Sequence, residues 1–170
     1  MFQGRELLAA DRSKTLEFFL LGLQDVSEPT VDPGELLYNA SVLAHYAQTS
    51  THDDFDWPAP VNLSTVFDHF VLDQSLLHDS HMMETAGAQC LLLAGFFEDQ
   101  MRQRYNIRWY ATVGASFFNR AAAHERSKRK ARLLDTISRR FEHWRQTHAR
   151  LSRELRDQPY VIRPKLPTDE

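Results

Sequence analysis

Residues 84–123 read ETAGAQCLLLAGFFEDQMRQRYNIRWYATVGASFFNRAAA and form the most apolar part of a chain that is otherwise polar. Between Ala86 and Phe97 only Gln89 is strongly polar, so this segment has no single amphipathic stripe. A helix that is apolar on most of its faces belongs at the centre of a protein. A second apolar segment follows residues 105–106, and we therefore expect two helices that fold back on each other with their turn there.

Two glycines interrupt the expected helices, Gly95 in the first and Gly114 in the second. A glycine in a helix interior costs about 1 kcal/mol relative to alanine. A glycine at such a position usually has a packing reason. The two glycines therefore predict that another backbone comes close to the hairpin at both places.

The remainder of the chain is helix-prone and contains one clear helix start. Residues 32–35, DPGE, combine a capping aspartate, a proline suited to the first helical position and a glutamate three residues after the cap. The apolar run at residues 16–23 is interpreted as a helix rather than a buried strand, because no second strand candidate lies nearby. We expect an all-α, single-domain bundle of about five to seven helices around the 84–123 hairpin, spanning residues 1–158, with an extended proline-containing tail at residues 159–170.

The last predicted helix, residues 126–157, is basic and carries a narrow apolar seam. Its seam positions fall on a seven-residue repeat in two columns, Leu134, Phe141, His148 and Leu155, and Ile137, Trp144 and Leu151. Three heptads with a narrow seam predict a helix that packs on one partner in a coiled-coil-like manner. That partner is either the core hairpin of the same chain or the same helix of a second subunit, which would make a homodimer.

His148 is the one polar residue in this seam. A polar residue at a seam position can set the register or the choice of partner. Alternatively, protonation of the imidazole would place a cation among apolar neighbours and act as a pH switch. In a subunit interface, such a switch would weaken the dimer below about pH 6.

The net charge of −3 conceals a strong asymmetry between the two parts of the chain. Residues 1–100 contain three Lys and Arg against sixteen Asp and Glu, a net charge of −13. Residues 101–170 contain seventeen against seven, a net charge of +10. Such asymmetry suggests a nucleic-acid or acidic partner. The alternative is that the basic helix packs near the acidic half of its own chain and the charges partly compensate.

The 170 residues include a single cysteine, Cys90, so a disulfide framework is excluded and a reducing compartment is expected. The first residues lack a basic start followed by an apolar run, which argues against a signal peptide. The apolar run that ends at Phe97 is too short to cross a membrane. We therefore expect a soluble, cytoplasmic protein that does not bind membranes.

His78, His81 and Glu84 are the candidate metal ligands. Residues spaced by three lie on the same face of a helix and could share a metal ion. Residues 79–80, however, have the pattern of a helix cap, which would place His78 outside the helix. The favoured interpretation is a polar helix start rather than a metal site.

Nothing in the sequence argues for catalysis. The nucleophile-elbow pattern, the phosphate-binding glycine loop and the dinucleotide fingerprint do not occur. Cys90 lies among leucines, where a thiol stays inert. We expect a non-catalytic chain without a cofactor.

The leading hypothesis is a protein–protein interaction or regulatory module that acts through the basic helix 126–157 and the tail. The residues predicted to make the interaction are Arg139, Arg140, Phe141, Trp144, Arg145, His148, Leu151 and Leu155. The alternative is a nucleic-acid-associated regulator that binds phosphates through the same helix, with an affinity that falls steeply with salt. A helical protein that binds a metal or ligand through the histidine cluster is the third hypothesis.

Overall fold

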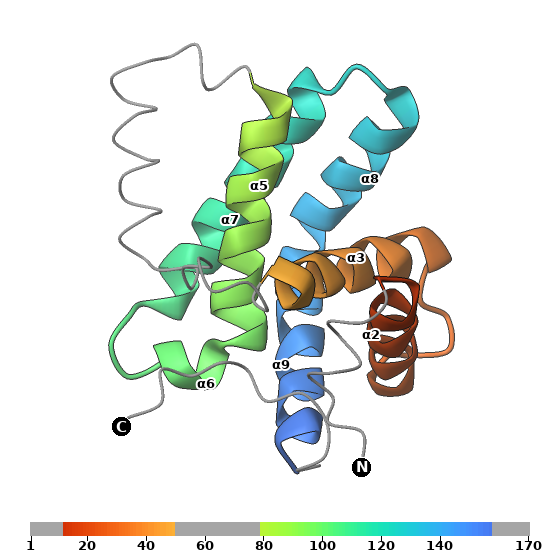
Figure 1. Ribbon diagram of the computed structural model, residues 1–170. Helices are drawn as coiled ribbons and strands as arrows, with labels where there is room; N and C mark the ends of the chain where they lie inside the picture. The colour runs from red at the N-terminus through yellow and green to blue at the C-terminus, as the bar shows by residue number, and fades with distance from the viewer. Residues whose placement is uncertain (1–11, 50–78, 158–170) are drawn as a thin grey trace. The chain divides into compact units, whose positions relative to one another are not determined.

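The computed structural model describes residues 12–49 and 79–157, and the regular elements in these ranges are all helical (Figure 1). In chain order they are α2 (Arg12–Val26), α3 (Pro33–Thr49), α5 (Ser80–Leu91), the π-helix η2 (Leu92–Phe96), α6 (Glu98–Met101), α7 (Ile107–His124), α8 (Lys128–Arg139) and α9 (Phe141–Asp157). The all-α prediction is therefore confirmed for the described residues. None of these helices is both long and apolar enough to cross a membrane. The predicted tail, 159–170, lies outside the described ranges.

The described residues fall into two compact units. The first contains α2, α3 and the end of α9 from Arg150, and the second contains the elements from α5 to α8 and the part of α9 that ends at Ala149. Each unit is described by itself below. The single-domain organisation of residues 1–158 stays a prediction.

In the first unit, α2 packs against α3, and a hydrogen bond ties the start of one to the end of the other. Gln48 Nε2 donates to Thr15 Oγ1 at 2.7 Å. The predicted start of α3 is confirmed, because the Asp32 carboxylate accepts a hydrogen bond from the Glu35 backbone N–H at 3.0 Å. Leu151, near the end of α9, covers Gly22 of α2, where a Cβ atom would lie 2.9 Å from the leucine Cδ1.

The second unit is built on the predicted hairpin, whose two arms are α5 and α7 (Figure 1). Asp79 caps α5 by accepting a hydrogen bond from the Met82 N–H at 3.0 Å, as its sequence position predicted. Asn106 caps α7 in the same way, so the expected turn lies where the sequence places it. Ser80 Oγ donates to the Ala121 carbonyl at 2.8 Å and joins the start of one arm to the end of the other.

The first arm of the hairpin ends in the π-helix η2, which the sequence did not predict. A π-helix is one turn that contains an extra residue, and it often occurs where a functional or packing constraint disturbs an α-helix. All five residues of η2 are buried. At Gly95 a Cβ atom would lie 3.0 Å from the Arg145 carbonyl oxygen and 3.2 Å from the Arg145 Cα. The backbone of α9 therefore contacts η2 directly, and the prediction for this glycine is confirmed.

At Gly114 the nearest atoms belong to side chains, and one of them is the Cβ of Cys90, the side-chain atom attached directly to the α5 backbone. A Cβ atom at this position would lie 2.6 Å from Cζ of Phe141 and 2.7 Å from the Cβ of Cys90. The glycine makes room for the Phe141 ring against α7. Cys90 is fully buried, and burial raises the pKa of its thiol to about 12. This cysteine is a free thiol.

The basic segment 126–157, predicted as one helix, consists of α8 and α9 with a break at Arg140. Arg140 has φ −103° and ψ 20°, outside the α-helical range. A straight helix drifts by about 20° per heptad from a seven-residue pattern. A break at Arg140 can bring the later seam positions back to the same face as the earlier ones. All seven seam side chains are buried within the single chain. Of the two partners that the seam allowed, the structure therefore shows burial against the chain itself.

We predict that Gly95→Ala lowers the free energy of unfolding by about 1–3 kcal/mol, because the new methyl group meets the Arg145 backbone, which cannot rotate away. Gly34→Ala is the matched control. Gly34 is exposed in the first turn of α3, and a Cβ atom there would meet only the end of the Asp32 side chain, whose Oδ2 would lie 3.1 Å away and need shift by only a few tenths of an ångström. The control should be neutral or stabilising by up to about 1 kcal/mol. Urea denaturation of both variants measures the difference, and equal effects would contradict the close contact.

Candidate functional site

The eight residues of the predicted interaction site lie in different environments. Five of them are buried within the chain, each at most 7% exposed: Phe141, Trp144, His148, Leu151 and Leu155. Arg139 and Arg140 are exposed, and Arg145 is held in a cluster of ion pairs. The apolar members of the site therefore stabilise the fold, and the surface that a partner can reach consists of cations.

His148 is completely buried, and burial lowers its pKa to about 3. A buried imidazole resists protonation because the charged form loses its hydration. In the folded chain this histidine therefore stays neutral throughout the range from pH 5 to 8. The hypothesis of a switch near pH 6 is not supported for a folded chain with this packing.

The pKa of His148 predicts how stability depends on pH. Above about pH 6.5 the imidazole is neutral in both the folded and the unfolded chain and contributes no pH dependence. Below that value the unfolded chain binds a proton that the folded chain does not. The free energy of unfolding should therefore fall by about 1.4 kcal/mol per pH unit from this group, until the pH approaches the folded pKa.

Urea denaturation at pH 7.5, 6.5 and 5.5 tests this dependence. The variant His148→Gln should lose the contribution of this group to the slope, whatever its absolute stability. His81→Gln changes an exposed histidine of α5 and should keep the slope of the wild-type chain. Identical slopes for the wild-type chain and His148→Gln would show that the imidazole is not buried in its neutral form.

The candidate metal ligands are only partly within the described residues. His81 is exposed at the start of α5, and His78 lies outside the described ranges. Glu84 accepts an ion-paired hydrogen bond from Lys130 Nζ at 2.9 Å, which raises the pKa of that lysine. Within residues 12–49 and 79–157 no three His, Cys, Asp or Glu side chains are grouped as metal ligands. The metal triplet therefore stays a prediction, and its glutamate already has a cationic partner.

Arg145 is the centre of an ion-pair cluster that connects three elements. Its Nη1 donates to Glu98 Oε1 of α6 at 3.0 Å and to the Ala94 carbonyl of η2 at 3.2 Å. Its Nε donates to Glu142 Oε2 at 2.9 Å, and its Nη2 contacts the other oxygen of the same carboxylate. The hydrogen bonds from Arg145 lower the pKa of Glu142, and those to Glu142 and Glu98 raise the pKa of the guanidinium. The cluster ties the first turn of α9 to η2 and α6.

We predict that Arg145→Met lowers the free energy of unfolding by about 2 kcal/mol, because it removes the 3.0 Å ion pair of the Glu98 carboxylate, whose side chain is only 14% exposed. Arg139→Met is the control. That residue pairs with Asp135 on the surface of α8, and an exposed pair contributes about 0.5 kcal/mol or less. Chemical denaturation of both variants gives the comparison. A loss of the same size for both would argue against the cluster.

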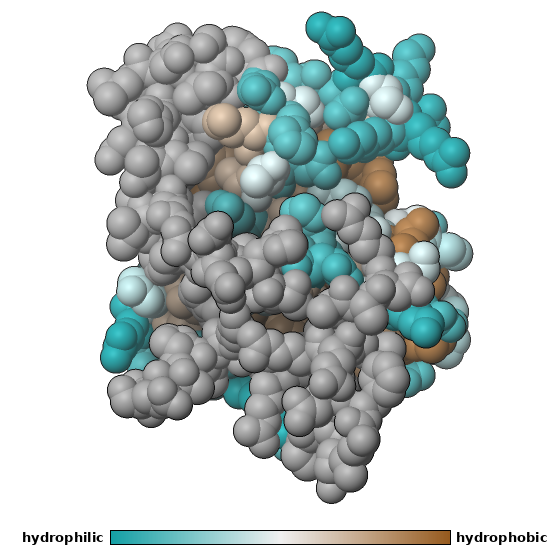
Figure 2. All heavy atoms as spheres, viewed as in Figure 1, coloured by the Kyte–Doolittle hydropathy of each residue, from teal (hydrophilic) through white to brown (hydrophobic). Residues whose placement is uncertain are grey.

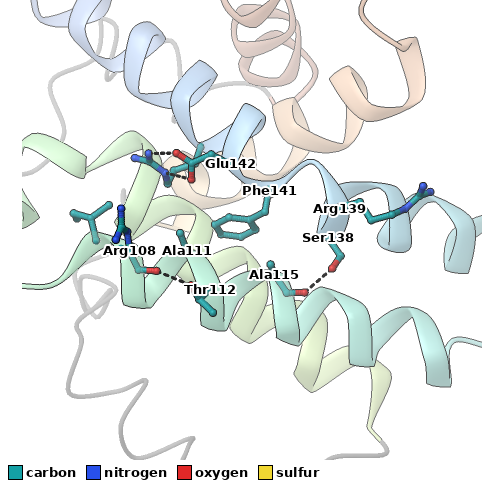
Figure 3. A pocket seen from close by; sticks show the side chains of 10 residues that line it. Arg108, Ala111, Thr112, Ala115, Ser138, Arg139, Phe141 and Glu142 are labelled. Atoms are coloured by element: carbon teal, nitrogen blue, oxygen red, sulfur yellow. Dashed lines mark hydrogen bonds and ion pairs between the residues drawn. The ribbon is translucent and has the colours of Figure 1, made fainter.

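A groove of about 600 Å³ lies between α7 and the junction of α8 with α9 (Figure 3). We call it the α7–α9 groove. Its apolar lining consists of Ile107, Ala111, Ala115 and Phe141, and its polar lining consists of Arg108, Thr112, Ser138, Arg139, Glu142 and Arg145. Figure 3 shows the Phe141 ring directed from the start of α9 toward Ala111, with Arg139 pointing away from it. The groove thus combines an apolar floor with a cationic rim.

The hydroxyl groups of the groove are engaged by the backbone of α7. Ser138 Oγ donates to the Ala115 carbonyl at 2.6 Å, and Thr112 Oγ1 donates to the Arg108 carbonyl at 2.9 Å. Their protons are therefore used within the fold, and the guanidinium groups are the remaining donors of the lining. The groove is equipped to hold an anion beside an apolar group.

A second candidate surface lies at the start of α8. It consists of Arg126, Lys128, Arg129 and Arg132, all of which are exposed, and we call it the α8 cationic surface. Figure 2 shows hydrophilic side chains gathered over this part of the second unit, at the upper right of the view. Within the described ranges none of the four side chains makes an ion pair. Their neighbour Lys130 differs, since it pairs with Glu84 and approaches Glu125 to 4.0 Å.

The position of these cations is unfavourable for the helix itself. The first turn of α8 contains Lys128, Arg129 and Lys130 and no acidic residue. Cations at a helix N-terminus oppose the helix dipole, by roughly 0.3–1 kcal/mol for each charge. Only one of the three is compensated by ion pairs in the described structure. The stability of the fold therefore does not explain why cations occupy the other two positions, Lys128 and Arg129.

Sequence reasoning identified the basic helix but missed both the groove and the Arg145 cluster. The spacing of Glu142 and Arg145 was visible, since residues three apart are neighbours on a helix. The contact with Glu98, 47 residues away, had no signal in the sequence. Comparison of the chain with protein-family models, with curated proteins and with solved structures finds no match.

Proposed function

We propose that the chain is a non-catalytic protein–protein interaction module that binds an acidic partner through the α8 cationic surface. The observation that carries this proposal is the group of four exposed cations that lack ion pairs in the described part of the chain. An acidic partner would offset both their mutual repulsion and the unfavourable interaction with the helix dipole. Binding therefore supplies a reason for an arrangement that folding alone disfavours.

The charges elsewhere on α8 and α9 support a localised contact. Arg139 pairs with Asp135 at 3.1 Å, and Arg145 pairs with Glu98 and Glu142. On α8, the exposed cations that make no ion pair in the described ranges therefore lie near its start, where Lys128 and Arg132 are neighbours on one face of the helix. A short cluster of carboxylates matches a surface of this size. Complementary charge of this kind contributes mainly to the association rate and to specificity.

Nucleic acid is the second candidate partner, because the same cations can neutralise phosphates. The acidic residues that follow along the helix favour a protein partner, since they interrupt the row of cations that a phosphate backbone would follow. Salt separates the two candidates. Nucleic-acid binding that neutralises several phosphates loses affinity steeply as the salt concentration rises.

We predict that the double variant Arg129→Gln/Arg132→Gln binds a fluorescein-labelled peptide of eight glutamates roughly tenfold more weakly than the wild-type chain, because it removes two exposed charges of the contact. Fluorescence anisotropy at 50 and 150 mM salt measures the affinity. The matched control is Lys14→Gln/Arg104→Gln, which removes the same net charge from exposed positions outside the α8 cationic surface.

Two outcomes would count against the proposal. If both double variants weaken binding equally, the peptide senses only the overall charge of the chain. If a 20-nucleotide single-stranded DNA binds more tightly than the peptide at 150 mM salt, with a steep salt dependence, nucleic acid replaces the acidic protein as the preferred partner.

A further inference from the structure

We infer that the α7–α9 groove receives a large apolar side chain of the acidic partner, while Arg108 binds a carboxylate next to that side chain. This inference rests on the proposed function and specifies the chemistry of the partner. The partner segment would thus carry an acidic cluster for the α8 cationic surface and, further along, an apolar residue flanked by an acidic one.

The size and the lining of the groove suit an inserted side chain. A volume of about 600 Å³ lies in the range of clefts that bind small groups, roughly 300–1,000 Å³. Phe141, Ala111 and Ala115 belong to the apolar floor of the groove. Burial of a Leu or Phe side chain against such a floor contributes on the order of 1.5–3 kcal/mol.

The floor is fixed before any ligand arrives. The Phe141 ring packs so closely against Gly114 that a Cβ atom there would lie 2.6 Å from the ring. The residue is only 3% exposed, and the Phe118 ring lies at 6.1 Å, centroid to centroid. A ring held in this way cannot move to fill the groove itself. A preformed site binds with a smaller entropic cost than one that must be ordered.

Arg108 is the cation of the groove that is available for a ligand. Arg139 and Arg145, the other arginines of the lining, are paired with carboxylates of the chain. In the described ranges Arg108 makes no ion pair, although its charge contributes to the lowered pKa of Glu142. A guanidinium group can bind a carboxylate through two parallel hydrogen bonds. The rim therefore favours an acidic residue beside the inserted side chain.

The distance along α8 sets the spacing of the two contacts. Lys128 belongs to the α8 cationic surface and Ser138 lines the groove, and ten residues of α-helix separate them by about 15 Å. An extended peptide covers this distance with about five residues, at roughly 3.3 Å each. The expected partner segment thus carries its apolar residue about five positions away from its acidic cluster.

A matched pair of peptides tests this inference. The sequences are EEEEGGGGFE and EEEEGGGGAE, each labelled with fluorescein at its N-terminus, and they differ only in the residue expected to enter the groove. The wild-type chain should bind the phenylalanine peptide roughly tenfold more tightly than the alanine peptide, because the aromatic ring is buried. Ala111→Leu fills the groove and should remove this advantage, so that the two peptides bind this variant with similar affinity.

Ala123→Leu is the control, because it adds the same atoms to an exposed position of α7 outside the groove. This variant should keep the full advantage of the phenylalanine peptide. Circular dichroism and urea denaturation confirm that both variants fold. Arg108→Gln should weaken binding of both peptides, since each carries the final glutamate, whereas Arg104→Gln should weaken binding less.

The remaining outcomes separate the inference from the proposed function. If both peptides bind the wild-type chain equally and Arg129→Gln/Arg132→Gln still weakens them, the inference fails and the proposed function stands. If neither peptide binds, both fail. The other possible occupant of the groove is a second copy of the chain, and native mass spectrometry of the protein alone tests for it. A dimer that the Ala111→Leu substitution dissociates would overturn the inference.

Discussion

The contact between Gly95 and the backbone of Arg145 is the constraint on which the second unit depends. Because Gly95 has no side chain, α9 reaches the surface of η2, and the same approach brings the Arg145 guanidinium to the Ala94 carbonyl and to Glu98. Close packing and charge compensation are therefore one feature of this structure. The position of α9 in turn determines where Phe141 enters the space beside α7, and the groove exists only because of that placement.

The cations of the basic part of the chain fall into two groups, those paired with carboxylates of the chain and those exposed to solvent. Cations that lie against the second unit, such as Lys130 and Arg145, have carboxylate partners, in agreement with the cost of removing an unpaired charge from water. The cations of the α8 cationic surface remain in solvent and keep their hydration, so their cost to the fold comes from the helix dipole and from mutual repulsion rather than from burial. The strong positive charge that the sequence shows is thus partly internal. Only the external part is available to a partner, which makes the accessible surface much smaller than the basic segment.

Features with local causes could be predicted from the sequence. The caps at Asp32 and Asp79 depend on residues within one turn, and the hairpin follows from the length of two apolar segments. The π-helix, the break at Arg140 and the Arg145–Glu98 pair depend on contacts between distant segments, which a single sequence does not encode in any spacing. The seven-residue seam correctly identified side chains that are buried. Its pattern is the same, however, whether they are buried against the same chain or against a second subunit. The groove could not be predicted from the sequence either, because its walls come from helices that are distant in the sequence.

The burial of Cys90 has a practical consequence. This thiol is the only one in the chain, it lies under Gly114 and the Phe141 ring, and its pKa of about 12 keeps it protonated near neutral pH. Thiol reagents attack the thiolate, so alkylation of the intact protein requires α5 and α7 to separate first. The rate of alkylation therefore reports how often the hairpin opens. The chain carries its own probe of local unfolding at the position where the groove, the hairpin and α9 meet, and no engineered label is needed to follow it.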